Sequence, residues 1–577
     1  MSPAPPSAPL ADLAARFWRF QCHETPLDAI LAGEATPDAT VFREGPADYE
    51  RRYAAAGDLL AELNGIGLPD LAPQDQATHR LLRYELETTR SLFEVSAHRR
   101  PSLFPSGPAL MAAHFANTAS VDDAESAERY VDRLATLPAF LRDSQANLRA
   151  GHADGTRYPR LVLDSAIGCT RGTTAGPVES SPWYGPFVRA AGAGKDPVRR
   201  AGARAEALIR DELVPALEGF AAFLEGPLAD GARGTVTCTD APQGRELYRV
   251  LVRHFTTTEL DPGEIHELGL NEVARLATDI ETVAADAGYP GQAEAYRRFL
   301  GTGEFFAPSA EALRERIEIL SKRIDRRIPA FFGRIPRVTY GVESMPEALA
   351  ARMPPAYAQP GPADGSGAGI HWVTSLPARF PSYLWLPVAL HEAWPGHLMH
   401  VALMQEAEGL PAFRRHGAVR YGACLEGWAL YCEGLGVEMG LYQTPHQLYG
   451  RLEGEIWRAV RLVVDTGIHW HRWDRARAVE YMSRHVAMPL PTIEGEVDRY
   501  ICWPGQALVY QIGNLRFREL RRRAEQRLGD RFRHRAFHDV LMAAAGVTLP
   551  VLADLVEDWL DREAGPEGGS EGSDERR

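Results

Sequence analysis

The sequence contains almost no lysine. Its 577 residues include only Lys195 and Lys322, and arginine supplies nearly all of the positive charge. Acidic residues outnumber basic ones, 77 to 63, so the formal net charge is −14. A surface that binds nucleic acid needs a basic stripe that neutralises phosphates. The composition therefore predicts a protein without a nucleic-acid partner.

Long apolar runs and paired cysteines are missing as well. The first twenty residues lack the basic segment and following apolar segment of a secretory signal. No run of about 18 or more apolar residues occurs, so no membrane-spanning helix is expected. Six cysteines are scattered without a CxxC pair: Cys22, Cys169, Cys238, Cys424, Cys432 and Cys502. These absences predict a cytoplasmic protein with reduced thiols and no thiolate zinc site.

Helical periodicity is the dominant pattern. Apolar residues recur at helical spacing over residues 50–92, 124–150 and 196–224. Another helix is expected after Asp261, because Asp261 can cap it and Glu264 stands where a capping box has a carboxylate. The sequence therefore predicts a mainly α fold.

Two short strands are expected, at residues 338–342 and 369–375. The segment between them, 354–368, is rich in Pro, Gly and Ala and is interpreted as a flexible loop. No repeat or low-complexity linker divides the chain. We expect one large helical domain over 1–564, with an N-terminal lobe at about 1–245, a second lobe at about 246–564 and a small β-sheet beside the cleft. Residues 565–577 are expected to form a disordered tail.

The most informative segment is HEAWPGH, from His391 to His397. In the zincin motif HExxH, two histidines four residues apart share one helix face, and the glutamate is the base for the attacking water. A spacing of six would point the two imidazoles about 120° apart on an unbroken helix. Pro395 interrupts a helix, however, and Gly396 tolerates unusual backbone angles. We predict a kink at Pro395 that brings His391 and His397 to one metal ion, with Glu392 as the base.

A third ligand is expected from the segment LEGWALYCE. Glu426 and Glu433 are seven residues apart and share a helix face. A carboxylate among apolar residues is costly to bury unless it is paired or metal-bound. We favour Glu426 as the ligand and Glu433 as a supporting residue; the reverse assignment and a solvated acidic pair remain alternatives. His400 is a further candidate ligand, three residues after His397. Three protein ligands and an open position favour a single catalytic Zn²⁺, although Mn or Co could substitute.

Four blocks of the sequence resemble those of a bacterial family catalogued as a domain of unknown function: HExxPGH, EGWALYxE, RxxRLVVDTGIH and PGQAxxY. The resemblance covers nearly the whole chain except the tail. Where the family commonly has His and Gln after the first block, this chain has Leu398 and His400. The family's arrangement is similar to that of helical gluzincin peptidases, such as the thimet-oligopeptidase and angiotensin-converting-enzyme groups. The resemblance implies a large two-lobed helical hydrolase.

Residues in the later blocks are candidates for supporting roles. His469 and Tyr510 can each donate a hydrogen bond to an oxyanion, although either can also be a satisfied core residue. Arg458 and Arg461 lie three residues apart. They can bind a peptide carboxylate or hold Glu426, Glu433 or Asp465 in place, and we favour the second interpretation.

The strand at 369–375 is a candidate edge strand that pairs with an extended peptide, which would put His371 near the cleft; a plain edge strand is the alternative. Together these features predict a zinc-dependent hydrolase that cleaves short peptides. A metal-dependent hydrolase of another amide or C–N bond in a small metabolite is the alternative enzyme. A binding protein without turnover is the alternative of a different class, but Glu392 argues against it. The oligomeric state is not predicted.

Overall fold

The computed structural model describes residues 7–564 except 35, 37, 191–195, 352, 418 and 419. The expected tail at 565–577 lies outside these residues. The described part contains 27 α-helices and one three-stranded sheet, which confirms the mainly α fold with a small β-sheet.

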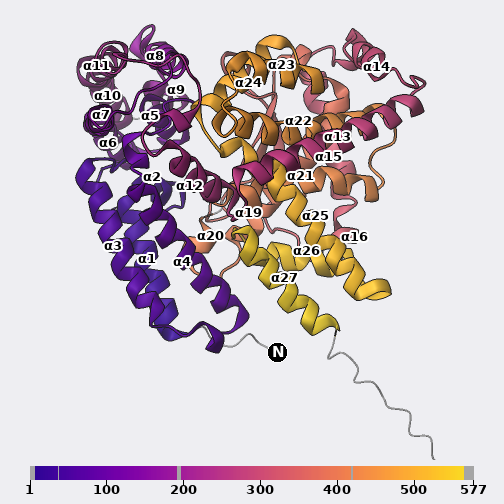
Figure 1. Ribbon diagram of the computed structural model, residues 1–577. Helices are drawn as coiled ribbons and strands as arrows, with labels where there is room; N and C mark the ends of the chain where they lie inside the picture. Colours follow the sequence, from indigo (N-terminus) through magenta and orange to yellow (C-terminus); the bar gives the residue numbers. More distant parts are fainter. Residues whose placement is uncertain are drawn as a thin grey trace, which may run out of the picture.

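Helices of the N-terminal part form two groups in Figure 1. Helices α1, α3 and α4 pack side by side, and α5 to α11 form a second cluster beyond their ends. A π-helical segment, Ile209–Leu213, joins α10 to α11. The bounds are α1 Ala8–Glu24, α2 Pro26–Leu31, α3 Pro46–Asn64, α4 Pro73–Glu94, α5 Pro108–Thr118, α6 Ala124–Leu134, α7 Leu137–Ala153, α8 Arg160–Thr174, α9 Gly185–Arg189, α10 Asp196–Leu208 and α11 Val214–Glu225.

The remaining helices lie on the other side of α12 in Figure 1. Two long pairs hold this part together, because α13 packs along α22 and α21 packs along α25. The bounds are α12 Gly244–Thr256, α13 Pro262–Asp286, α14 Ala293–Leu300, α15 Ala310–Asp325, α16 Ile328–Phe331, α17 Glu347–Ala350, α18 Trp385–Glu392, α19 His397–Gln405, α20 Ala412–Arg415, α21 Gly422–Glu438, α22 Pro445–His469, α23 Arg475–His485, α24 Leu490–Cys502, α25 Val509–Leu528, α26 His534–Ala544 and α27 Leu549–Ala564.

The expected start of α13 is confirmed. The Asp261 carboxylate accepts a hydrogen bond from the Gly263 amide, and the Glu264 carboxylate accepts one from the Asp261 amide. These bonds satisfy amides that have no partner within the helix. The sequence therefore fixes where one of the longest helices begins.

The sheet consists of β1 (Tyr340–Ser344), β2 (Ala356–Gln359) and β3 (Gly369–Val373) in the order β1-β3-β2. Strand β3 is parallel to β1 and antiparallel to β2, so it is the central strand. The expectation that residues 369–375 form an edge strand is therefore wrong. The edge strand β2 lies inside the segment that we expected to be a loop, because prolines and glycines around its four residues conceal it.

Two large apolar clusters fill the interior. The first includes Leu217 from the N-terminal part and Val463 from α22; the second includes Leu81 from α4 and Leu390 from α18. Both clusters thus join residues from before and after position 245. A lobe boundary near residue 245 stays a prediction.

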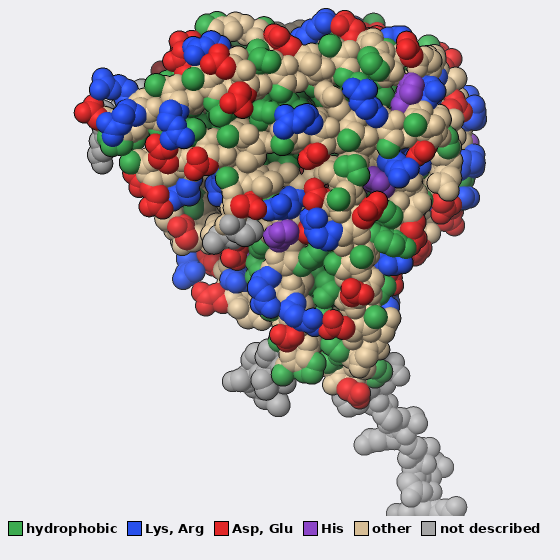
Figure 2. Space-filling view, turned by 90° about the vertical axis from the view of Figure 1, so that its left-hand side faces the viewer, with side chains coloured by type: hydrophobic (Ala, Val, Ile, Leu, Met, Phe, Trp, Pro, Cys, Tyr) green, Lys and Arg blue, Asp and Glu red, His purple; other side chains and the backbone are tan. Residues whose placement is uncertain are grey.

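The surface and the thiols show no specialised feature in the described residues. On the face in Figure 2, acidic and basic side chains are interspersed, so neither charge occupies an extended area there. All six cysteines are free thiols, and three of them, Cys424, Cys432 and Cys502, are buried. No described helix has both the length and the apolar character needed to cross a bilayer.

Candidate metal centre

The predicted kink at Pro395 is present as a complete break between two helices. Helix α18 ends at Glu392 and α19 begins at His397, and a turn that includes a cis Trp394–Pro395 bond separates them. A side chain on Gly396 would overlap the carbonyl oxygen of His391, so the turn requires glycine there. The buried Trp428 indole on α21 stabilises the turn by donating a hydrogen bond to the Pro395 carbonyl (2.9 Å).

This break brings the two imidazoles together. The ring centroids of His391 and His397 are 4.8 Å apart, and the ring planes are nearly perpendicular. Each Nε2 atom is 3.4 Å from the same oxygen, Oε2 of Glu426 on α21. The three predicted ligand residues therefore converge on one point. Among the described residues, no other three His, Cys, Asp or Glu side chains converge this closely, and His400 is not part of the set.

The geometry of this set fits a tetrahedral metal ion. Zinc lies about 2.0–2.2 Å from nitrogen and oxygen ligands, so two ligand atoms at a tetrahedral angle are about 3.4 Å apart. Both nitrogen–oxygen distances have this value. The three side chains are mostly buried but remain accessible to solvent, since 22% of the Glu426 side chain is exposed. A divalent ion thus fits the donor set by ligand type, spacing and access.

Glu433 supports His391 from the side opposite to Glu426. Its carboxylate accepts a hydrogen bond from His391 Nδ1 (2.9 Å) and lies 3.7 Å from the Arg458 guanidinium. Burial lowers the pKa of His391, but hydrogen bonds to Glu426 and Glu433 raise it to about 9. A carboxylate on the second nitrogen of a ligand histidine fixes which nitrogen faces the ion. The geometry thus favours Glu426 over Glu433 as the third donor toward an ion, with Glu433 on the other nitrogen of His391 and Arg458 beside Glu433.

Glu392 lies beside the three converging residues and is held by the sheet. Its carboxylate accepts a hydrogen bond from the Ala358 amide on β2 (2.9 Å). Burial is the main cause that raises its pKa above the usual carboxyl range, and the negative charge of Glu426 adds to it. A raised pKa brings a carboxylate closer to the value that suits a general base at neutral pH. The role of Ala358 could not be predicted from the sequence, because a contact through a backbone amide does not depend on the residue type.

Tyr510 reaches the centre because α21 and α25 cross closely. A side chain on Gly427 would overlap the Cα atom of Gly513, so this crossing requires the two glycines. The Tyr510 side chain is half-buried, and burial together with the charge of Glu426 raises its pKa. The Arg461 guanidinium lies over its ring, 4.5 Å from the centroid. The causes that shift this pKa are burial and neighbouring charges, with no hydrogen bond to the hydroxyl among them.

His469 is not available as the oxyanion donor that we expected. Its Nδ1 accepts a hydrogen bond from the Cys238 amide (3.1 Å), and its Nε2 donates one to the Tyr500 carbonyl (3.0 Å). Burial lowers its pKa to about 4, so the ring is neutral and both nitrogens are occupied. The residue ties the end of α22 to two neighbouring segments.

Arg461 differs from expectation, since it pairs with none of Glu426, Glu433 and Asp465, and Asp465 has other partners. Arg461 donates to the Tyr500 hydroxyl (3.0 Å) and pairs with Glu496 (3.3 Å). Asp465 accepts hydrogen bonds from the Tyr248 hydroxyl (2.6 Å) and the Gly505 amide (3.1 Å). Burial raises the pKa of Asp465 to about 7. These two residues support the turn and the helix that carry Tyr510.

Two further histidines lie in the interior. His371 on the central strand is fully buried, and neither ring nitrogen has a hydrogen-bond partner among the described residues. His400 is 1% exposed and packs beside Trp428. Burial lowers the pKa of His371 to about 4 and that of His400 to about 3, so both rings are neutral. His400 is not among the converging donors, so its candidate role as a ligand is wrong, whereas a place for His371 near the cleft stays a prediction.

Comparison with known proteins shows the family and leaves the activity open. No curated protein sequence matches the chain. A candidate lipoprotein from Colwellia psychrerythraea has a similar structure, with 26% identity, a TM-score of 0.88 and coverage of 96% of this chain and 99% of that one. A candidate lipoprotein of unknown function from Shewanella oneidensis shares the fold at 16% identity, with a TM-score of 0.73 and coverage of 96% and 100%. The family model for bacterial proteins of unknown function, DUF885, matches residues 26–556, and the chain belongs to this family.

Proposed function

We propose that this protein is a zinc-dependent hydrolase that cleaves short peptides, with one ion held by His391, His397 and Glu426. One observation carries the proposal: a single Glu426 oxygen lies 3.4 Å from the Nε2 atoms of both histidines. Two histidines, one carboxylate and an open position are the ligand pattern of catalytic zinc in peptidases. This is the arrangement that the resemblance to gluzincin peptidases implies.

Charge in the site also supports a cation. Glu392, Glu426 and Glu433 place three carboxylates around two histidines, and Arg458 is the one arginine in ion-pair contact with them among the described residues. Burying a charged carboxylate is costly unless it is paired or bound to metal. A divalent ion would balance the remaining negative charge.

The chemistry divides between the ion and the side chains. A bound zinc ion acts as a Lewis acid, polarises an amide carbonyl and lowers the pKa of water. Glu392 accepts the proton of the attacking water and passes it to the leaving amine. The Ala358 amide keeps the Glu392 carboxylate in place during both transfers. The Tyr510 hydroxyl donates a hydrogen bond to the oxyanion.

The edge strand favours a peptide over a smaller amide. In an antiparallel ladder, the amide and carbonyl groups of one residue point to the same side. Because the Ala358 amide points to Glu392 and away from β3, its carbonyl also points toward the site. An extended substrate can pair with this carbonyl, and backbone pairing is a common way to bind peptides.

The direct test is metal analysis of the purified protein together with a peptide-library digest read by mass spectrometry. We expect close to one zinc ion per chain and cleavage of short peptides that stops with a chelator and returns with added zinc. A protein that binds no divalent ion would contradict the proposal. One that binds zinc and cleaves no peptide, but hydrolyses small amides, would support the alternative enzyme.

Tyr510→Phe is expected to lower kcat by about 10² with little change in KM, because it removes one oxyanion donor and keeps the ring. Steady-state kinetics on a peptide from the library digest would measure this. Tyr481→Phe, a half-buried tyrosine on α23, is the matched control and should keep wild-type kinetics. Equal kinetics for both variants would remove Tyr510 from the proposed mechanism.

Glu433→Gln is expected to weaken zinc binding by about 10- to 100-fold, because the hydrogen bond that orients His391 loses its charge. Competition with a fluorescent chelator would measure the zinc affinity. Glu438→Gln is the control, since Glu438 lies on the same helix but pairs with Arg521 at the surface. Unchanged affinity in Glu433→Gln would show that Glu433 does not support the ligand.

A further inference from the structure

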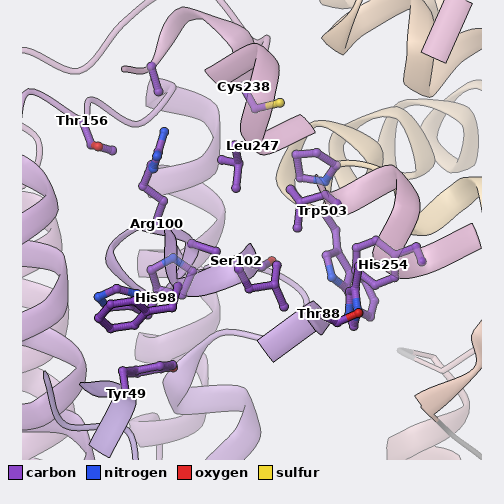
Figure 3. A pocket seen from close by; sticks show the side chains of 18 of the residues that line it. Tyr49, Thr88, His98, Arg100, Ser102, Thr156, Cys238, Leu247, His254 and Trp503 are labelled. Atoms are coloured by element: carbon purple, nitrogen blue, oxygen red, sulfur yellow. The ribbon is translucent and has the colours of Figure 1, made fainter. Parts of the chain in front are cut away.

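A cavity of about 470 Å³ lies apart from the metal centre, where α1, α3 and α4 approach α12 and the end of α24. None of its lining residues belongs to the proposed catalytic site; His391, Glu392, His397, Glu426 and Tyr510 are all absent from its walls. Figure 3 shows the side chains that surround it. Its volume is within the usual range for a small-molecule site, roughly 300–1,000 Å³.

The charged residues of the cavity wall are mostly cationic. Five arginines line it: Arg52, Arg100, Arg157, Arg233 and Arg420. The wall has two carboxylates, Glu24 and Glu85. Both are already paired, Glu24 with Arg51 and Arg52, and Glu85 with Arg420. The cavity therefore has an excess of positive charge in a protein whose net charge is negative.

Two of these arginines have no carboxylate in ion-pair contact within the described part of the chain. Arg100 donates hydrogen bonds to the carbonyls of Val95 and Pro242. Arg157 donates to the carbonyls of His152 and Thr156. Burial is the main cause that lowers the pKa of Arg100 below its usual value. In Figure 3 the Arg100 side chain lies between Thr156 and Leu247, two other residues of the cavity wall. An anion in the cavity would therefore meet arginine side chains in its wall that backbone carbonyls hold in place.

The opposite wall is apolar. Leu247, Leu251 and Phe255 recur every four residues on one face of α12, and that face lines the cavity. Trp503 packs edge-on against Phe255. His98 adds no charge, because burial lowers its pKa to about 4. An apolar ligand body would therefore be buried against α12 while its charged end faces the arginines.

We propose that this cavity binds an organic carboxylate with an apolar body, of the size of a medium-chain fatty acid, independently of the metal centre. The carboxylate lies against Arg100 and Arg157, and the apolar body lies along Leu247, Leu251 and Phe255. Arginine binds carboxylates with paired hydrogen bonds, and a mostly apolar pocket with a few polar groups is the usual form of a small-molecule site.

Calorimetric titration with octanoate, 1-octanol and octylamine tests which head-group charge the cavity prefers. The three compounds have alkyl chains of similar length and differ in the charge of the head group. We expect saturable binding of octanoate, about tenfold weaker binding of octanol and no binding of octylamine. Octanoate binding should be the same with and without a chelator. Octanoate binding that disappears with the chelator would mean that the carboxylate binds the metal centre. Equal affinity for the three compounds would mean that the arginines play no role in binding. Either result overturns the proposal.

Variants locate the binding. Arg100→Gln should weaken octanoate binding about tenfold and leave octanol unchanged, whereas Arg99→Gln should change neither. Arg99 is the matched control, since it pairs with Asp154 and does not line the cavity. Leu251→Trp fills the cavity and should abolish binding of both compounds. Thermal melts test whether each variant is folded. If Arg100→Gln does not fold, Arg157→Gln tests the same loss of positive charge. Octanoate binding that none of these folded variants reduces would overturn the proposal.

Discussion

Replacing Glu392 with glutamine is expected to lower peptide hydrolysis by about 10³-fold while the zinc content stays at the wild-type level. Glutamine has nearly the same shape, and its side-chain oxygen can still accept the Ala358 amide hydrogen bond. It cannot accept a proton from water, so the attack loses its base. The measurement is kcat on a peptide from the library digest, with zinc determined in the same preparations.

Two outcomes would contradict this assignment. If Glu392→Gln keeps most of its activity, another group must be the base. If it loses zinc, Glu392 is a ligand and the three-residue set is wrong. Glu343→Gln is the control, because Glu343 is an exposed carboxylate on β1, in the same sheet that supports Glu392. The experiment also separates a hydrolase from a binding protein, since the ligand binding of a protein without turnover would not change.

The convergence of His391, His397 and Glu426 could be predicted from the sequence because it depends largely on local spacing. Pro395 and Gly396 stand between the two histidines, so their effect on a helix follows from elementary backbone geometry. The seven-residue spacing of Glu426 and Glu433 puts both on one helix face, and the structure gives each a contact with His391. Spacing of this kind requires only that the segment be helical, which its composition already favours.

The features that the sequence did not predict depend on contacts between distant segments. His469 ends a helix in a block shared with the family, but its role is decided by the backbone of Cys238 and Tyr500. The position of β3 in the middle of the sheet depends on β2, four residues within a segment rich in proline and glycine. The cytoplasmic location and the peptide substrate also stay predictions, since no local pattern decides either.

The approach of His391 to His397 depends on Gly396 in the turn between them, and replacing this glycine with alanine tests that dependence. The added carbon would overlap the His391 carbonyl oxygen and lie 2.5 Å from both the His391 carbonyl carbon and the Leu390 oxygen. These are backbone atoms of α18, so the clash cannot be relieved by a side-chain rotation. Relief requires α18 and α19 to move apart, which separates the two imidazoles.

Gly396→Ala is therefore expected to destabilise the protein by about 3 kcal/mol and to weaken zinc binding by at least about 100-fold. Urea denaturation of the metal-free protein measures the first effect, and chelator competition measures the second. Gly434→Ala is the matched control, because a side chain at Gly434 on α21 would meet open space, although the residue follows Glu433 directly. Alanine there should keep zinc affinity and stabilise the helix by up to about 1 kcal/mol. Gly396→Ala could instead keep the wild-type free energy of unfolding and the wild-type zinc affinity. In that case the tight turn is not what brings His391 and His397 together. The six-residue spacing would then need another explanation.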